Sequence, residues 1–268
     1  MAIYTQAPRS GSIPAINIKK GRETACCDPS ALPTPPPELM QYGETADRHL
    51  VAGRRESDAI TNALERAGRP LDDCRHILDF GCGNARVLRW FANQSSKNEL
   101  WGCDIRSDLM FWALENLSPP FRFFVNTTIP HLPFRDGYFD LIICNSVFTH
   151  LTELHLSWLL ELRRIISDRG LLYVTLHDEG YLQRIEDNSF LEHESTTKTI
   201  RQTVHEIGLD MRRVDFMATS LHSDGMWGQV FISERYFRKI LPPGLEICSV
   251  EPRGYADCQT SYLITRNG

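Results

Sequence analysis

An apolar run at residues 76–80 carries an acid, Asp79, and leads directly into a glycine loop, which is the arrangement of a nucleoside-binding site. The loop reads Gly81-Cys82-Gly83, and glycines there let the backbone approach a ligand closely. Asp104 ends the next apolar run, about 20 residues after the loop, where a carboxylate can bind both hydroxyls of a ribose. The competing interpretation of Asp104 is a helix N-cap, and its spacing from the glycines favours ribose binding.

The loop does not fit a dinucleotide. That fingerprint needs a third glycine at position 86, where a helix packs tightly on the sheet and a pyrophosphate sits on the helix N-terminus. This chain has Arg86 there, and it also lacks a Tyr-x-x-x-Lys pair. A nicotinamide-dependent oxidoreductase or epimerase is therefore disfavoured.

The acid-glycine pattern of Asp79, Gly81, Gly83 and Ala85 resembles the first motif of class I S-adenosylmethionine-dependent methyltransferases. The resemblance spans roughly residues 70–265. It implies that S-adenosylmethionine is the cofactor and that the loop, Cys82 included, passes beneath its methionine moiety. It also implies that Asp79 meets the cationic end of the cofactor directly or through water. Ala85 stands where the family usually has a third glycine, and we expect it to shift the helix start without closing the pocket.

The stretch from Asn126 through the Leu132-Pro133-Phe134 run to Asp140 resembles the methyltransferase segment that follows the third strand. The resemblance implies that Asn126 or Thr127 contacts the adenine amine. The alternative is that Asn126 only caps a turn. Ile105, next to Asp104, is expected to supply an apolar wall for the adenine.

The run Asn145-Ser146-Val147-Phe148-Thr149-His150-Leu151 resembles a stretch of bacterial methyltransferases that act on small molecules and sugars. It implies that Asn145 and Ser146 lie alongside the methionine moiety. His150 is a candidate for contact with cofactor or substrate. A capping or core hydrogen bond is the alternative role for this histidine.

His177 follows the fifth apolar run, at the edge where a methyl acceptor should enter. Methyl transfer from a sulfonium is an in-line displacement, so positioning dominates catalysis and a base is needed chiefly for a hydroxyl acceptor. His177 is the candidate base. The alternative makes residues 177–179 a solvated turn. No metal site is predicted, because no metal-binding spacing connects the candidate ligands, which are His150, His177, Asp178, Glu179 and His222.

Two segments near the end resemble the tail of the same bacterial group. One holds Met226, Trp227 and Phe231, which are candidates for a substrate wall or for core positions. In the other, Gly254-Tyr255 precedes Gln259, and Thr260 replaces the usual aspartate. Any role that this acid carries in the family is therefore in doubt here.

Apolar runs alternate with helical patterns, which predicts an α/β fold with a doubly wound, mostly parallel, seven-stranded sheet. Strands are expected at 76–80, 99–103, 121–125, 138–144, 170–176, 245–250 and 259–265. Helices are expected at 84–95, 107–117, 152–167 and 233–241. Residues 38–70 form a predicted helical lid, with a helix over 44–67 that Gly53 can break, and residues 177–232 form an insertion that shapes the acceptor site. Residues 1–37 are expected to be a flexible, Pro-rich arm.

The composition limits the choice of partners. With 42% hydrophobic residues, 24% charged residues and a net charge of −5, the chain has no long basic run, so nucleic acid is disfavoured. The apolar stretches are too short to span a bilayer, and the N-terminus lacks the apolar core of a signal peptide. Among the eight cysteines there is no Cys-x-x-Cys pair. Cys82, Cys103 and Cys144 are expected to be small buried hydrophobic residues in a reducing, cytoplasmic compartment.

Together these patterns predict an S-adenosylmethionine-dependent methyltransferase that acts on a small molecule, most simply on a hydroxyl of a metabolite or sugar. N-methylation is one alternative. The other is a catalytically idle protein that binds S-adenosylmethionine and acts as a scaffold or regulator. The cofactor motifs do not separate these alternatives, because all of them require the cofactor.

Overall fold

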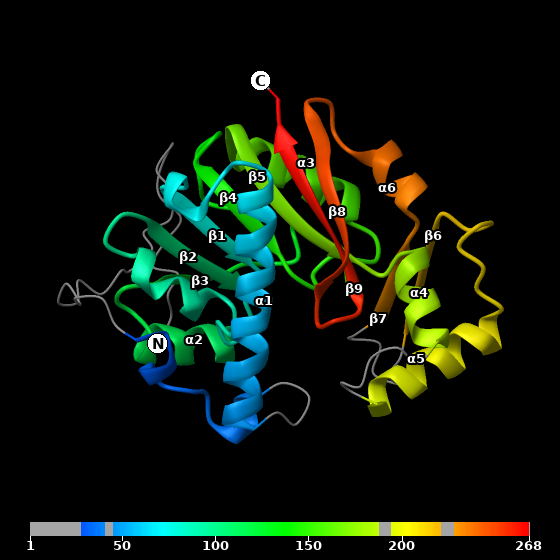
Figure 1. The fold of residues 1–268 in the computed structure, drawn as a ribbon, viewed down its shortest axis with the longest axis horizontal. Coiled ribbons are helices and arrows are strands. Elements are labelled where there is room, and N and C mark those ends of the chain that lie inside the picture. The colour runs from blue at the N-terminus through cyan, green and yellow to red at the C-terminus, as the bar shows by residue number, and fades with distance from the viewer. Residues whose placement is uncertain (1–27, 41–44, 188–193, 221–227, 268) are drawn as a thin grey trace.

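The structure is a computed structural model that describes residues 28–40, 45–187, 194–220 and 228–267. Its centre is a seven-stranded sheet of order β3-β2-β1-β4-β5-β9-β8 (Figure 1). The first five strands run parallel, and β9 runs antiparallel to both of its neighbours. The predicted doubly wound, mostly parallel sheet is confirmed. The strands are β1 His76–Phe80, β2 Glu99–Asp104, β3 Arg122–Val125, β4 Phe139–Cys144, β5 Ile166–Leu176, β8 Leu245–Tyr255 and β9 Gln259–Arg266.

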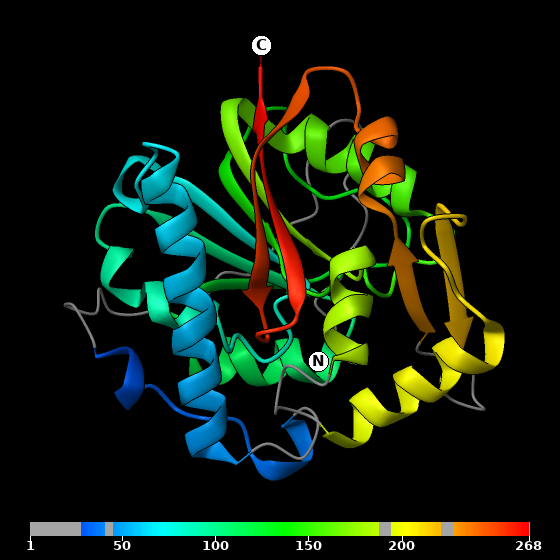
Figure 2. The ribbon, with the colours of Figure 1, turned by 45° about the vertical axis from the view of Figure 1, so that its right-hand side comes forward.

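Helices cover both faces of the sheet, because successive strand residues point to opposite sides. Ile77 packs in one core with α1 (Ala46–Arg66) and α2 (Ser107–Asn116). Leu78, the next residue, packs in a second core with α3 (His155–Ile165) and α6 (Glu234–Ile240). Figure 2 shows α1 on one side of the sheet, with α3 and α6 on the other. Among the described helices, none combines the length and the apolar character that crossing a bilayer requires.

The segment between β5 and α6 forms a unit at one end of the sheet (Figure 2). Its elements are α4 (Glu179–Glu186), α5 (Glu194–Ile207), β6 (Phe216–Ser220) and β7 (Gly228–Ile232), with β6 and β7 paired antiparallel. Tyr181, Ile200 and Phe231 belong to a third, small core that also includes Cys258 from the turn between β8 and β9. A single bridge between His177 and Phe231 connects β7 to the end of β5. The unit is therefore held next to the carboxyl edge of the parallel strands.

The predicted α-helix over residues 84–95 is wrong. Turns follow the glycine loop, and the segment then continues as the 3-10 helix η5, Leu88–Gln94. Ala85 adopts a φ of +60°, in the left-handed region that disfavours residues with a Cβ. A residue in that conformation interrupts a right-handed helix, so the α-helix cannot begin at residue 84.

The expected break at Gly53 is also wrong, because α1 runs through it without interruption. A Cβ on Gly53 would lie 2.2 Å from the carbonyl oxygen of Arg86 and 2.9 Å from the indole nitrogen of Trp90. Gly53 therefore lets α1 cross directly over the segment that follows the glycine loop. Its role is close packing and not flexibility.

Residues 28–39 differ from the predicted extended arm. They form the 3-10 helices η1 (Pro29–Ala31) and η2 (Pro37–Leu39), and Pro29 is buried. The fully buried guanidinium of Arg89 donates to the carbonyl oxygens of Pro29, Leu32 and Pro33. This one side chain supplies donors that a proline-rich backbone cannot supply itself. Residues 1–27 lie outside the described part of the chain.

The fifth strand begins at Ile166, four residues before its expected start, so α3 is correspondingly short. The pairing of β4 with β5 shifts register between Phe139 and Leu141, and Arg169 lies opposite this irregularity with a φ of +67°. The expected turn at residues 168–170 is thus absorbed into a distorted strand start. Another 3-10 helix, η4 (Leu71–Asp73), connects α1 to β1.

Candidate functional site

The glycine loop lies where the strand order of the sheet reverses, because β1 pairs with β2 on one side and with β4 on the other. This is the place where open α/β sheets bind ligands. The backbone amides of Gly81 and Cys82 donate to the carbonyl oxygen of Cys103, at 2.8 and 2.9 Å. Gly81 has a φ of +75°, and a Cβ there would lie 2.4 Å from a methyl group of Val147. Only glycine fits between the ends of β2 and β4.

Asp104 is tied into the glycine loop. Its two carboxylate oxygens accept one hydrogen bond each, from the backbone amides of Gly83 and Arg106, both at 2.9 Å. Arg106, not Asp104, is the N-cap residue of α2, so the capping interpretation of Asp104 is wrong. Each carboxylate oxygen can accept a further hydrogen bond. The ribose role of Asp104 remains a prediction that this geometry allows.

Asp79 is a buried acid at the centre of the site, with 2% of its surface exposed. Burial first, and the nearby carboxylates of Asp104 and Glu56 second, together raise its pKa to about 7, while Arg86 acts in the opposite direction. Asp79 thus lies within electrostatic reach of two other acids and one arginine. A ligand with a cationic group would stabilise the charged form of Asp79. The carboxylates of this site therefore fit the positive end of S-adenosylmethionine.

Glu56 and Arg86 form a buried ion pair that the sequence did not reveal. The carboxylate of Glu56, in α1, lies 3.0 Å from the guanidinium of Arg86, which also donates to the hydroxyl of Tyr255 at 2.7 Å. The contact joins the predicted lid helix, the glycine loop and the end of β8. Helical periodicity places Glu56 in a helix but cannot reveal a partner 30 positions later in the chain.

Asn126 and Thr127 follow β3 next to Asp104. The backbone amide of Asn126 donates to the carbonyl oxygen of Asp104, and its side-chain nitrogen donates to the carbonyl oxygen of Thr127. The side-chain oxygen of Asn126 is buried and has no hydrogen-bond partner among the described residues. Thr127 is exposed and closes a turn by accepting from the amide of Ile129. Nearby, Ile105 is 48% exposed, which leaves it available as an apolar wall.

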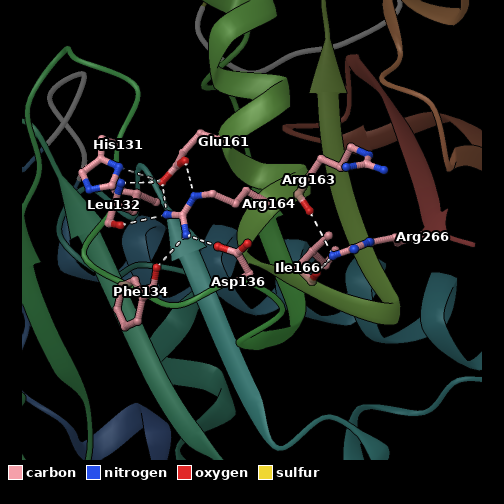
Figure 3. Close-up of polar contacts among 9 residues, drawn as sticks. All are labelled: His131, Leu132, Phe134, Asp136, Glu161, Arg163, Arg164, Ile166 and Arg266. Carbon is pink, nitrogen blue, oxygen red and sulfur yellow. Dashed lines mark hydrogen bonds and ion pairs between the residues drawn. The ribbon is translucent and has the colours of Figure 1, made fainter. Parts of the chain in front are cut away.

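A polar cluster around Arg164 fixes the loop that follows Asn126 (Figure 3). The guanidinium donates to the carbonyl oxygens of Leu132 and Phe134 and to the carboxylates of Asp136 and Glu161. Glu161 in turn accepts from the backbone amide of Leu132 at 2.6 Å. The loop has little regular structure, and α3 therefore supplies the partners that its backbone needs.

Asn145 and Ser146 follow β4 at the same edge. Asn145 is 8% exposed, and neither its amide nitrogen nor its amide oxygen has a partner among the described residues. Ser146 has a φ of +54°, and its backbone amide donates to the hydroxyl of Thr175 at 2.7 Å. Gln259 accepts from the same hydroxyl and donates to the side chain of Ser146. This network holds a strained residue in place, and the orphaned amide of Asn145 is where a polar ligand would find partners.

The two candidate histidines differ in access. His150 is partly buried, and its Nδ1 lies 2.8 Å from the carbonyl oxygen of Gly228. His177 is 4% exposed and stacks on Tyr181 with ring centroids 3.9 Å apart. Burial lowers the pKa of His150, and burial followed by the neighbouring His150 places the pKa of His177 well below its usual value. Both rings are therefore neutral at neutral pH.

Residues 177–179 are not a solvated turn, so that alternative is wrong. Asp178 is 4% exposed and caps α4 by accepting from the backbone amide of Tyr181. Its carboxylate also accepts from the hydroxyls of Thr260 and Tyr262, both at 2.7 Å. Thr260, which replaces the family's aspartate, therefore binds an aspartate that comes from the end of β5.

Of the remaining candidates for a substrate wall or a metal site, one lies in the core and three lie outside the residues that the structure describes. Phe231 is fully buried in the small core of the insertion, as the core alternative predicted. Met226, Trp227 and His222 lie outside the described residues. Within the ranges that the structure describes, no three His, Cys, Asp or Glu side chains are grouped so that they could hold a metal ion.

Residues 78–174 match the family described as methyltransferase domain. Malonyl-[acyl-carrier protein] O-methyltransferase of Geobacter sulfurreducens is 30% identical over 140 residues, which are 52% of this chain and 51% of that protein. The chain thus matches about half the length of this curated relative.

Solved structures with the same architecture include 1,6-didemethyltoxoflavin-N1-methyltransferase of Burkholderia thailandensis with bound S-adenosylhomocysteine. The two share 14% identity and a TM-score of 0.53, over 82% of this chain and 80% of that one. Magnesium protoporphyrin IX methyltransferase of Synechocystis, also with S-adenosylhomocysteine, has 16% identity and a TM-score of 0.52 over 84% and 88% of the two chains. At these identities the structures show a shared fold.

Proposed function

The chain carries a class I S-adenosylmethionine-dependent methyltransferase domain, and we propose that it methylates a hydroxyl group of a small molecule. The observation that carries the proposal is the hydrogen bond of 2.8 Å between His150 Nδ1 and the carbonyl oxygen of Gly228. A carbonyl oxygen can only accept, so this bond places the imidazole hydrogen on Nδ1 and the basic lone pair on Nε2. A fixed, neutral imidazole is what removal of a hydroxyl proton requires.

The residues that hold the cofactor in this proposal come from four strand ends. Asp79 pairs with its amino group, and Asp104 accepts from the ribose hydroxyls. The orphaned side-chain oxygen of Asn126 supports that residue over Thr127 as acceptor for the adenine amine. The remaining contacts are the glycine loop with Cys82, the apolar side chain of Ile105 and the amides and hydroxyls of Asn145 and Ser146. Bound S-adenosylmethionine supplies a methyl group that its sulfonium activates as an electrophile.

His150 takes the catalytic role in this proposal more readily than His177. The hydroxyl oxygen of the acceptor forms the new bond to the methyl carbon as the bond from carbon to sulfur breaks, and Nε2 of His150 takes the hydroxyl proton. His177 is enclosed by Tyr181 and Phe231, so an acceptor can reach it only if the insertion moves. We assign His177 to packing between β5 and the insertion, where it shapes the acceptor side.

The overall charge of the chain supports a small acceptor. The net charge of −5 disfavours a nucleic acid. The relatives act, by their names, on an acyl-carrier-protein-bound malonyl group, on a didemethylated toxoflavin and on a magnesium porphyrin, so they include both O- and N-methylation.

The described cysteines are free thiols, which supports a reducing, cytoplasmic location.

The test is to incubate the protein with methyl-deuterated S-adenosylmethionine and a metabolite extract, and to identify labelled products by mass spectrometry. With the identified acceptor, His150→Ala should lower kcat by about 10²–10⁴-fold, and cofactor affinity should change by no more than a few fold. His155→Ala is the matched control, since His155 is also buried and also bonds a backbone carbonyl oxygen, of Thr152.

Three outcomes contradict the proposal in different ways. Cofactor binding without any labelled product would indicate a scaffold. A label on nitrogen would replace O-methylation by N-methylation. An unchanged kcat in His150→Ala would show that His150 is not the base, and positioning alone would then account for the rate.

A further inference from the structure

A hollow lies away from the glycine loop, between the end of α1 and the hairpin of β8 and β9. It has a volume of about 450 Å³, and we call it the arginine hollow after Arg66, Arg69 and Arg169 in its wall. An adjoining hollow of about 490 Å³ shares Arg66 and Glu251 with it. Figure 1 shows the end of α1 close to the last residues of β9 at the C-terminal end of the described chain. Since Arg169 lies at the start of β5 and the glycine loop follows the end of β1, the two sites occupy opposite edges of the parallel strands.

The charges of the arginine hollow are unbalanced. Arg66 pairs with Glu251 at 2.9 Å, and Glu251 is the one carboxylate in the wall. Arg69 and Arg169 have no carboxylate within ion-pair distance among the described residues. The wall also contains the side chains of Ser249 and Thr265, and Leu171 closes part of it. Two uncompensated guanidinium groups next to hydroxyls form a donor-rich surface suited to the oxygens of a phosphate.

The backbone at Arg169 is an independent sign of a constraint at this place. Arg169 has a φ of +67°, a conformation that favours glycine and costs free energy for any residue with a Cβ. The next residue is Gly170, yet the left-handed position itself is occupied by arginine. Strain of this kind gathers at functional sites, where a specific side chain is worth keeping.

We propose that the arginine hollow binds a small molecule that carries a phosphate or diphosphate group. Its volume lies in the range of small-ligand pockets. An extended polyanion such as a nucleic acid fits less well, because Glu251 faces the same hollow and the chain is acidic overall. The proposal does not depend on methyl transfer, and the cofactor site contributes no residue to it.

The experiment is calorimetric titration of the full chain with inorganic pyrophosphate in a low-salt buffer. We expect saturable binding of one ligand per chain. Arg169→Gly is the most informative variant, because glycine suits the observed backbone and folding should be retained. It should weaken binding by about tenfold, which is typical for loss of one charge-assisted contact. Arg69→Ala combined with Arg169→Gly should abolish measurable binding, while S-adenosylmethionine affinity stays unchanged.

The matched control removes two arginines elsewhere on the surface, Arg54→Ala with Arg212→Ala. Both side chains are exposed, and the change in net charge equals that of the double variant in the hollow. The control should bind pyrophosphate as the parent does. Absence of saturable binding in the parent protein overturns the proposal, and so does an equal loss in the control, which would show a response to net charge alone.

Discussion

Asp79 is a buried acid whose protonation depends on the charges beside it. Its carboxyl has no described cation in direct contact, and its pKa of about 7 reflects burial first and the neighbouring carboxylates second. Without a ligand, Asp79 therefore keeps its proton in the folded state between about pH 4 and pH 7, whereas in the unfolded state, with a pKa near 3.8, it loses the proton. The stability from this group is fully present below about pH 4, and it is lost as the pH rises towards about 7.

This shift predicts the pH dependence of cofactor binding. In the proposed site the ammonium group of S-adenosylmethionine pairs with the charged form of Asp79. Affinity should then be constant above about pH 7.5 and fall by up to about tenfold per unit below about pH 6.5. Calorimetry across this range measures it. Asp79→Asn should bind more weakly and lose most of the pH dependence. A parent protein whose affinity does not change with pH contradicts the assignment of Asp79 to the cationic end.

Asp104 has two roles to separate, because it already holds the amides of Gly83 and Arg106. Asp104→Ala should lower affinity for S-adenosylhomocysteine by about 1–3 kcal/mol, the range for removing a charged acceptor from buried hydroxyls. For an analogue that lacks the 2′-hydroxyl the loss should be clearly smaller, since part of the interaction is already missing. Asp108→Ala, an exposed acid in the first turn of α2, is the control. An equal loss for both ligands would assign Asp104 to loop structure only.

At the scale of elements, the crossing of α1 over the segment after the glycine loop decides how the site is closed. Gly53 makes this close approach possible, and the ion pair of Glu56 with Arg86 lies one turn further along the same helix. The helix therefore brings a buried acid towards Asp79 while it covers one face of the sheet.

Gly53→Ala tests this packing. Helix propensity alone predicts a gain of about 1 kcal/mol for this change. Because the new Cβ would meet a backbone carbonyl oxygen at 2.2 Å, we expect instead a loss of about 1–3 kcal/mol in the free energy of unfolding, together with weaker cofactor binding. Denaturant titration measures the first effect and calorimetry the second. Gly180→Ala in α4 is the control, since the atoms nearest its Cβ would be side-chain atoms of Arg184 and Asp178, the closest at 2.9 Å, and not a backbone atom. A stabilised Gly53→Ala would show that α1 is not seated as described.

At the scale of the whole molecule, the cofactor candidates come from segments that lie far apart in the sequence and meet at one edge of the sheet. The ends of β1, β2, β3 and β4 supply them. A cofactor bound to all four strand ends should therefore stabilise the whole sheet against unfolding. At a ligand concentration 100 times Kd, binding contributes about 2.7 kcal/mol. For a chain of this size we expect a rise in Tm of about 5–10 °C with S-adenosylmethionine, measured by calorimetric scanning. Asp104→Ala should show a smaller rise at the same concentration, and NAD should give none.

The sequence by itself determined the central sheet and the candidate residues of a cofactor site. Apolar runs of strand length alternate with helical patterns, which predicts a mostly parallel sheet. The candidates from Asp79 to Ser146 could be predicted because each lies in the last residues of a strand or shortly after it, and parallel strands end at one edge. These are local signals, carried by neighbours in the chain.

Only the tertiary structure decided which polar groups are satisfied and which are not. The ion pair of Glu56 with Arg86, the support of the loop by Arg164 and the carboxylate that Asp178 presents to Thr260 all join residues far apart in sequence or on separate elements. The same holds for the left-handed conformation of Ala85, which prevents the expected helix from starting at residue 84. It also holds for the different burial of His177, which is enclosed, and His150, which is partly buried. Burial and pairing depend on three-dimensional neighbours. A periodic pattern of apolar residues carries no information about which side chain of another element will contact a given residue.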